Sequence, residues 1–306
     1  MKTLIVGGTG LVGGHAALHL TEKGHDVTIM SRNKPTAHAL QDTNFLNCNY
    51  IEDDVADGRL EGFDALVFAA AQDIRQLPMD GSIAPDAFYK KANDEAVPRF
   101  FEAAKAAGIK RTAYVGSFYP QVAPERIELD PYVNSRHVTD EAVRALSSDQ
   151  FNVCSLNAPF ILGELPGLDV PHILGLIAYV SGQLPDLPLF APLGGTNHIT
   201  AKSVAESIEG ALERGESGTA YLIGDQNYTW KEYLEAWASA AGAPINLDVR
   251  SDDHPILPNA IMFAGAGTLV SYEPNAQESA LLDYSRNQVG DEINSMARSA
   301  LAGVQG

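Results

Sequence analysis

Residues 3–13 have the sequence Thr3-Leu-Ile-Val-Gly-Gly-Thr-Gly-Leu-Val-Gly13, a short apolar run followed at once by glycines at positions 7, 10 and 13. A helical pattern continues from this turn to Gly24, and a second β-rich run follows at residues 26–30. A strand, a glycine turn, a helix and a second strand form the βαβ unit that receives the pyrophosphate of a dinucleotide at the helix N-terminus. The sequence therefore predicts a dinucleotide site whose turn consists of Gly7, Gly10 and Gly13.

The residues between these glycines are expected to take part in the same site. Thr9, Leu11 and Val12 lie where their backbone would be close to the phosphates. A mononucleotide P-loop is disfavoured because no Gly-Lys-Ser/Thr sequence ends the turn. A tight turn without a ligand is the alternative interpretation, and the strands on both sides of the helix favour the dinucleotide site.

The alternation of apolar runs and helical patterns continues through the first 160 residues. β-rich runs lie at residues 3–6, 26–30, 45–50, 65–69, 112–115 and 152–156. Helical patterns lie at residues 11–23, 86–107 and 131–146, and glycines follow the first two where a left-handed C-cap is common. This alternation predicts an α/β fold with a doubly wound parallel Rossmann sheet in residues 1–160.

The pattern changes after Pro159. Prolines at positions 166, 171, 185, 188 and 192 interrupt an apolar region that lacks the earlier alternation. Helical patterns return at residues 203–214, 230–241 and 287–301, with a short strand at 221–224 and an irregular stretch at 252–271. We therefore expect residues 161–306 to form mainly a smaller C-terminal substrate-binding lobe, with a segment near residues 195–225 returning to the dinucleotide-binding domain.

The charge of the chain limits its partners. It has 39 acidic and 21 basic residues and a net charge of -18, which repels phosphate backbones and anionic lipid surfaces. No apolar run reaches the roughly 20 residues that a membrane-spanning helix needs. We therefore expect a small-molecule substrate, and neither nucleic acid nor a membrane as a partner.

The cysteines and histidines favour a reducing compartment and no metal site. Cys48 and Cys154 are far apart in apolar stretches, as expected of buried free thiols in a cytoplasmic protein. His15 and His19 have the spacing of a helical zinc pair, but no glutamate lies between them and no third ligand is evident. We interpret both as packing or surface histidines.

Two residues after the second strand bear on the choice of cofactor. An NAD-specific site has a carboxylate there for the ribose hydroxyls, whereas this chain has Ser31 and Arg32. A guanidinium forms paired charge-assisted hydrogen bonds with phosphate oxygens, which suits a 2′-phosphate. The sequence therefore favours NADP(H) over NAD(H). The alternative is that Arg32 stacks on the adenine, which either cofactor allows.

Further motifs downstream of the glycine turn also match a known family. In these motifs the chain resembles the extended or atypical short-chain dehydrogenases/reductases, which include the NAD-dependent epimerases and dehydratases. The matching segments follow in the family's order over nearly the whole chain: the glycine turn at residues 7–13, Asp54-Val55, Ala69-Ala70, Asn93, Tyr114-Val-Gly-Ser117, Tyr132-Val-Asn-Ser-Arg136 and Asn157-Ala-Pro159. The resemblance implies that Asp54 approaches the adenine amine, that Ala69 and Ala70 lie beside the cofactor, and that the segment containing Pro159 covers the nicotinamide. It also implies a homodimer formed through the helices at 86–107 and 131–146.

The same resemblance implies three catalytic residues. Hydride transfer to a carbonyl leaves an alkoxide, which needs a proton donor and a second hydrogen-bond donor. By the resemblance Tyr132 is the acid and Ser117 is the second donor. The family's lysine, four residues after the tyrosine, is replaced here by Arg136. Arginine keeps the charge that stabilises a phenolate, but its longer planar head does not reproduce the lysine contacts to the ribose by default.

This replacement leaves three interpretations of the site open. The first is a working variant in which Tyr132 and Arg136 act together. The second is a proton relay that has moved to another group, such as the neighbouring His137. The third is a degenerate site that binds the cofactor without turnover, which would suit a redox-sensing protein.

The C-terminal half gives a weaker indication of the substrate. Residues 166–192 are mostly apolar with almost no basic residues, whereas a nucleotide-sugar diphosphate needs Arg or Lys. Asn157 stands where the family often has arginine, and His198 is interpreted as either a substrate contact or a packing residue. We expect an oxidoreductase of a hydrophobic carbonyl or alcohol. A sugar-type epimerase or dehydratase with a retained cofactor is the alternative, and the apolar stretch could equally be lobe core.

Overall fold

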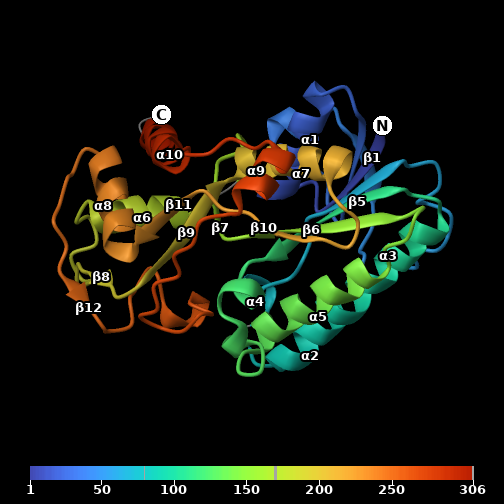
Figure 1. Ribbon diagram of the computed structural model, residues 1–306. Coiled ribbons are helices and arrows are strands. Elements are labelled where there is room, and N and C mark those ends of the chain that lie inside the picture. The colour runs from blue at the N-terminus through green and yellow to red at the C-terminus, as the bar shows by residue number, and fades with distance from the viewer. Residues whose placement is uncertain (79, 169–170, 305–306) are drawn as a thin grey trace.

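The computed structural model describes residues 1–78, 80–168 and 171–304. Its centre is a seven-stranded parallel sheet in the order β10-β6-β5-β4-β1-β2-β3 (Figure 1). The strands are β1 (Lys2–Val6), β2 (Asp26–Ser31), β3 (Asn44–Asn47), β4 (Ala65–Phe68), β5 (Arg111–Ser117), β6 (Asn152–Ala158) and β10 (Ala220–Leu222). The chain winds outwards from β1 in both directions, which confirms the predicted doubly wound Rossmann sheet.

Both faces of this sheet are covered by helices, which explains why its strands are almost continuously apolar. Helices α1 (Leu11–Glu22), α7 (Ala201–Arg214) and α9 (Ala276–Leu282) lie on one face, and α2 (Pro85–Tyr89), α3 (Ala96–Ala106) and α5 (Pro131–Ala145) lie on the other (Figure 1). Ile5 faces the core under α1 and α7, and its neighbour Leu4 faces the core under α3 and α5. The two-residue alternation of β1 thus supplies both cores.

Two details of the predicted elements are wrong. The helix expected at residues 86–107 is divided, because a π-helical segment, η3 (Lys90–Glu95), separates α2 from α3. The strand expected at 45–50 ends at Asn47, and the chain then turns so that the Tyr50 hydroxyl donates to the carbonyl of Ala70 at 3.0 Å. Neither feature changes the apolar pattern on which the predictions relied.

The C-terminal lobe, on the left of Figure 1, has its own sheet and hydrophobic core. Strands β7 (Phe160–Leu162), β9 (Gly195–Thr200) and β11 (Gln226–Thr229) form a three-stranded sheet, and β8 (Ala191–Pro192) pairs with β12 (Val249–Arg250). Helices α6 (Pro171–Val180), α8 (Trp230–Ala240) and α10 (Val289–Val304) pack around them. Short helices complete the described chain: α4 (Tyr119–Val122), η1 (His38–Leu40), η2 (Ile74–Gln76), η4 (Pro124–Arg126) and η5 (Asn259–Ile261).

Helix α6 is absent from the sequence prediction. The proline that seemed to interrupt this stretch, Pro171, is the first residue of the helix, where its missing N–H group costs nothing. Ile173, Leu176 and Ile177 are buried against the lobe core. A helix that is apolar over most of its surface lacks the amphipathic pattern that would identify it.

The chain returns to the Rossmann domain twice after entering the lobe. Within the expected returning segment, β9 belongs to the lobe sheet, whereas α7 packs against α1 and β10 joins the central sheet. A second return, not anticipated from the sequence, brings α9 against α7, where the Arg214 Nε donates to the carbonyl of Leu281 at 2.7 Å.

Most of the residues considered above for metal or thiol chemistry serve in packing. His15 lies 3.0 Å from the carbonyl oxygen of Glu164, and His19 lies 2.6 Å from the carboxylate of Glu209. Both cysteines are free and buried, and burial raises the pKa of Cys154 to about 12. Within the described residues no three His, Cys, Asp or Glu side chains are grouped to hold a metal ion.

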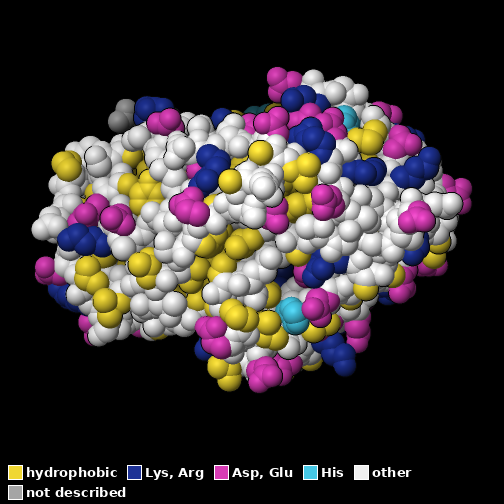
Figure 2. Space-filling model, viewed as in Figure 1, with side chains coloured by type: hydrophobic (Ala, Val, Ile, Leu, Met, Phe, Trp, Pro, Cys, Tyr) yellow, Lys and Arg dark blue, Asp and Glu magenta, His cyan; other side chains and the backbone are white. Residues whose placement is uncertain are grey.

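Charged and hydrophobic side chains are distributed differently on the face of the molecule that Figure 2 shows. Acidic and basic groups are scattered over this face, and hydrophobic groups gather near the middle, where the lobe meets the lower helices. None of the helices in the described part of the chain combines the length and apolar character needed to cross a membrane.

A fourth hydrophobic cluster joins the lobe to the Rossmann domain and includes Phe118, Tyr119, Val133 and Val270.

Candidate active site

The glycine turn is packed too tightly for a side chain at two of its three predicted positions. Gly7 has a φ of +79°, and a Cβ on it would lie 2.8 Å from the carbonyl oxygen of Ala69. A Cβ on Gly13 would lie 2.3 Å from the carbonyl oxygen of Gly7. At Gly10, by contrast, the nearest such atom would be 3.5 Å away. The turn is therefore held against the end of β4 and is less crowded on the side of Gly10.

The N-terminus of α1 begins in this less crowded region. Gly10 is the N-cap residue and supplies no side chain to cap the helix. The backbone N–H groups of Leu11, Val12 and Gly13 lie in the first turn, where a helix provides no acceptor. An uncapped N-terminus has a partial positive charge and free donors, both of which favour an anion. The cradle therefore fits the pyrophosphate expected from the sequence.

Gly13 and Gly10 differ in the space available for a side chain, and thermal unfolding can detect this difference. Gly13→Ala is expected to destabilise the protein by about 1–3 kcal/mol, because its methyl group overlaps the Gly7 carbonyl. Gly10→Ala is the matched control, and its expected cost is only roughly 0.5 kcal/mol, from the weaker N-cap. Equal melting temperatures for the two variants would contradict the close packing at Gly13.

The end of β2 lies beside this turn. The Thr9 hydroxyl donates to the hydroxyl of Ser31 at 2.9 Å, so the turn and the strand end are directly linked. Arg32 is exposed, and its carbonyl accepts a hydrogen bond from the Asn47 side chain at 2.7 Å. The structure thus places the Ser31 hydroxyl next to the glycine turn and leaves the following residue, Arg32, exposed.

Four other predicted cofactor residues lie near the ends of β3 and β4. Asp54 is exposed, and its carboxylate accepts a hydrogen bond from the backbone two residues later. Val55 is buried in the core under α3 and α5. Ala69 and Ala70 directly follow β4 and remain partly exposed. Ala69 and Ala70 therefore lie at the edge of the sheet at which the strands end, where α/β sheets bind their ligands.

Asn93 and its neighbour connect this edge to the helix that carries Tyr132. The fully buried Asn93 accepts from the backbone N–H of Gln72 at 2.9 Å and donates to the Gln72 carbonyl at 3.0 Å. The next residue, Asp94, accepts a hydrogen bond from the Ser135 hydroxyl at 2.5 Å. Both side chains come from the π-helical segment, and π-helical turns are frequent at functional sites.

Ser117 and Tyr132 come together where β5 ends and α5 begins. Asp130 is the N-cap of α5, and its carboxylate accepts from the backbone N–H groups of Tyr132 at 2.9 Å and Val133 at 3.1 Å. Tyr132 is thereby fixed in the first turn, with the Ser117 side chain close enough to affect its phenol. Burial raises the pKa of Tyr132, and the opposing effects of Arg136 and of the Ser117 side chain are smaller.

Arg136 lies one helical turn after Tyr132 and is only 5% exposed. Its Nη2 donates to the carbonyl of Val115 at 2.8 Å, and its guanidinium lies 5.4 Å from the centre of the Tyr114 ring. Its Nε has no hydrogen-bond partner among the described residues. The charge of Arg136 lowers the pKa of Tyr132. Arg136 therefore acts on the phenol while its head is directed towards β5, and its buried Nε is an unused donor.

Comparison with known proteins identifies the family. The model of the NAD dependent epimerase/dehydratase family matches residues 3–224. The chain belongs to this family. Among curated proteins, none matches it in sequence.

Solved structures similar to this epimerase/dehydratase-family chain are remote in sequence. The structure of gox2253 has a TM-score of 0.76 at 20% identity and covers 99% of this chain and 98% of its own. The structure of UDP-N-acetylglucosamine 4-epimerase from Bacillus cereus has a TM-score of 0.72 at 17% identity, and the match covers 98% of this chain and 99% of that chain. A double mutant of DesIV, a dTDP-glucose 4,6-dehydratase from Streptomyces venezuelae with NAD bound, has a TM-score of 0.73 at 18% identity, and the match covers 97% of this chain and 96% of that chain. At these low sequence identities, the structural similarity shows that the fold is shared and nothing more.

Several residues around the tyrosine of this family member were not found from the sequence. The ring of Phe263 packs on the ring of Tyr132 with 4.3 Å between centroids and 31° between planes, and Tyr89 packs edge-on at 5.6 Å. Asp73 and Arg75, in the loop after β4, form an ion pair at 2.6 Å, and the charges of both act on Tyr132. None belongs to a motif, and Phe263 lies in the stretch expected to be irregular.

Asn157 stands at the sequence position where the family often has arginine. It pairs with Gly116, the residue before Ser117, and a Cβ on Gly116 would lie 1.7 Å from the Asn157 Oδ1. The Asn157 Nδ2 donates to the side chain of Gln121 at 2.9 Å. Pro159 follows β6 and is buried. A small neutral amide therefore occupies the position beside the strand end that delivers Ser117.

Both histidines considered as functional residues have structural partners. His198 is fully buried and stacks on Tyr233 with 4.6 Å between ring centres, and burial lowers its pKa to about 3. This environment favours the packing interpretation. His137 lies on α5 with its Nε2 3.5 Å from the carboxylate of Glu141, one turn further along the helix.

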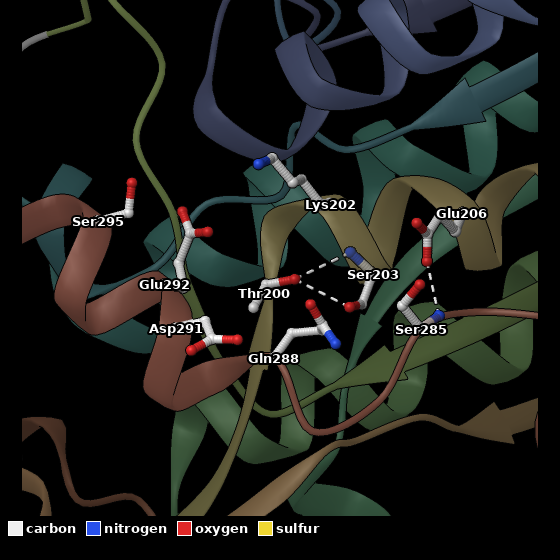
Figure 3. Close-up of a pocket in the computed structure, with 9 residues that line it drawn as sticks. All are labelled: Thr200, Lys202, Ser203, Glu206, Ser285, Gln288, Asp291, Glu292 and Ser295. Carbon is white, nitrogen blue, oxygen red and sulfur yellow. Dashed lines mark hydrogen bonds between the residues drawn. The ribbon is translucent and has the colours of Figure 1, made fainter.

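A polar cavity of about 240 Å³ lies apart from the predicted site (Figure 3). It is lined by Thr200, Lys202, Ser203, Glu206, Ser285, Gln288, Asp291, Glu292 and Ser295. In Figure 3 the cavity lies between the N-terminal parts of α7 and α10 and the loop that precedes α10, and the Glu206 carboxylate accepts from the Ser285 backbone N–H of this loop at 2.6 Å. None of the predicted cofactor or catalytic residues lines it.

Proposed function

We propose that this protein is an NADP(H)-dependent oxidoreductase that reduces or oxidises a hydrophobic carbonyl or alcohol by hydride transfer, with Tyr132 as its acid–base residue. The main support is that Ser117 ends β5 and Tyr132 begins α5 so close together that the Ser117 side chain and the charge of Arg136 both lower the pKa of the Tyr132 phenol. A proton donor, a second donor and a fixed positive charge are what stabilisation of a developing alkoxide requires.

The cofactor fits the residues that surround the glycine turn. When bound, NADP(H) supplies the hydride donor or acceptor. The uncapped N-terminus of α1 would hold the pyrophosphate, and Ser31 and Arg32 would hold the 2′-phosphate. The unpartnered Nε of Arg136 supports a further acceptor near Tyr132. Asp54, Ala69 and Ala70 would flank the remainder of the dinucleotide.

The chain's own residues account for the movement of the proton. Because burial raises its pKa, Tyr132 is protonated at neutral pH and can give its proton to the carbonyl oxygen in the reductive direction. Ser117 would donate a second hydrogen bond to that oxygen and fix its position. Arg136 stabilises the phenolate that remains, because an opposite charge favours the ionised form.

The preference for NADP(H) is tested by Arg32→Ala. The variant is expected to bind NADPH about 10- to 100-fold more weakly, because it loses charge-assisted hydrogen bonds to the 2′-phosphate, each worth about 1.5–3 kcal/mol. Its affinity for NADH should not change, since NADH lacks that phosphate. Equilibrium titration of cofactor fluorescence measures both constants. Equal loss of NADPH and NADH binding would contradict the proposed role of Arg32.

A sugar-type epimerase or dehydratase that retains its cofactor is the second candidate. It is favoured by the structural neighbours, which include an epimerase of UDP-N-acetylglucosamine and a dehydratase of dTDP-glucose. Such an enzyme consumes no net cofactor. Incubating the purified protein with these nucleotide sugars, without added cofactor, and separating the products distinguishes it from a reductase, which oxidises NADPH stoichiometrically.

A further inference from the structure

The ring of Phe263 lies directly against the ring of Tyr132. The centroids are 4.3 Å apart and the planes are inclined by 31°, so the two rings pack closely in a tilted arrangement. Tyr89 covers the same tyrosine edge-on at 5.6 Å, and Tyr132 keeps part of its surface exposed. Phe263 belongs to the C-terminal lobe, so the lobe supplies one wall of the space around the tyrosine.

The backbone of Phe263 is attached to the helix that carries Tyr132. Arg126 Nε donates to the Phe263 carbonyl at 2.9 Å, and Arg126 Nη2 lies 3.8 Å from the carboxylate of Asp130. The same carboxylate accepts the backbone N–H of Tyr132. The cap of α5 therefore holds both the tyrosine and the loop that covers it.

The other end of this loop is fixed to the lobe. The backbone N–H of Gly195 donates to the Thr268 carbonyl at 3.2 Å, and the Val270 N–H donates to the Gly195 carbonyl at 3.0 Å. Tyr119 contacts the ring of Phe263 edge-on at 5.5 Å. Attachments at both ends and a side-chain neighbour define the position of the Phe263 ring in the structure.

We propose that Phe263 is a specificity-determining residue, and that its ring selects compact apolar carbonyl or alcohol substrates at Tyr132. This inference rests on the proposed function, because it concerns the substrate of that same site. A substrate must bring its oxygen within hydrogen-bonding distance of the tyrosine hydroxyl. With Phe263 on one face of the tyrosine ring and Tyr89 at its edge, a bulky substrate has room only on the remaining side.

The same wall has no hydrogen-bonding group of its own. A substrate hydroxyl that points at the Phe263 ring leaves water without gaining a hydrogen-bond partner. An aliphatic or small aromatic group gains from burial against the ring. On the side that Phe263 covers, the wall therefore favours an apolar group over a polar one.

Phe263→Ala tests this inference through the size of the accepted substrate. NADPH oxidation is measured with a short aldehyde, propanal, and a bulky one, 2-naphthaldehyde. We expect kcat/KM for the bulky aldehyde to rise by about tenfold relative to that for propanal, because selection by apolar contacts is commonly of this order. Phe88→Ala is the matched control, since Phe88 contacts Tyr89 at 5.4 Å. An unchanged ratio in Phe263→Ala would overturn the proposal.

A second measurement does not require turnover. Tetranitromethane nitrates accessible tyrosines, and peptide mass spectrometry gives the extent at Tyr132 alone. Removal of the Phe263 ring is expected to raise nitration of Tyr132 several-fold, with no change in Phe88→Ala. Equal nitration in wild type and Phe263→Ala would show that the ring does not form the wall. If nitration rises but no variant oxidises NADPH with any carbonyl compound, the proposed function fails, and the substrate assignment is rejected with it.

Discussion

Replacing Tyr132 with phenylalanine is expected to slow NADPH oxidation by hydrophobic ketones and aldehydes by roughly 10²- to 10⁴-fold, the usual contribution of a positioned general acid. The change removes the hydroxyl that lies near Ser117 and keeps the ring that packs against Phe263 and Tyr89. The affinity for NADPH should not change, because the glycine turn is untouched. Steady-state rates and a cofactor titration measure the two effects separately.

Tyr221→Phe is the control for this experiment. Tyr221 is also buried, but it lies in the core under α1 and α7, where its hydroxyl accepts from the Glu216 backbone N–H at 2.8 Å. Its hydroxyl has no role in the proposed chemistry, so the rate should be retained. An unchanged rate in Tyr132→Phe would show that another group, such as His137, supplies the proton. A wild-type protein that binds NADPH but turns over no carbonyl compound would support the non-catalytic sensor instead.

Replacing Arg136 with methionine is expected to slow alcohol oxidation by roughly 10- to 100-fold. In this direction Tyr132 acts as a base and must be ionised, and the nearby guanidinium lowers its pKa. Without that charge the pKa of Tyr132 rises, so a smaller fraction of phenolate is present at a given pH. The limb of the pH–rate profile that reports this ionisation should therefore move to higher pH.

Arg136→Lys is the matched control for the charge. It places the family's usual residue at this position and keeps the positive charge, so the pH–rate profile should remain near that of the wild type. Thermal unfolding must accompany both variants, because Arg136 is buried and donates to the Val115 carbonyl. A stable Arg136→Met variant with an unshifted pH–rate profile would contradict the electrostatic role.

Much of the fold could be predicted because its signals are local. The apolar run of β1 and the glycines that follow it specify a strand and a turn within a dozen residues, and the parallel order of the sheet agrees with the predicted alternation. Helix α6 lacked such a signal, because a mostly buried helix has no polar face. The π-helical segment also preserves the apolar pattern of an ordinary helix, so the sequence did not reveal it.

The candidate site was predictable only in part, for the same reason. The sequence by itself determined the glycine turn, which depends on spacing within one element, and its resemblance to a family pointed to Ser117 and Tyr132. Only the tertiary structure decided that Phe263 covers Tyr132 and that Arg136 is directed towards the Val115 carbonyl. The first contact joins residues far apart in the chain, and the second is one of several that the arginine could make. Which contacts form depends on packing and burial, which the spacing of residues along a sequence does not encode.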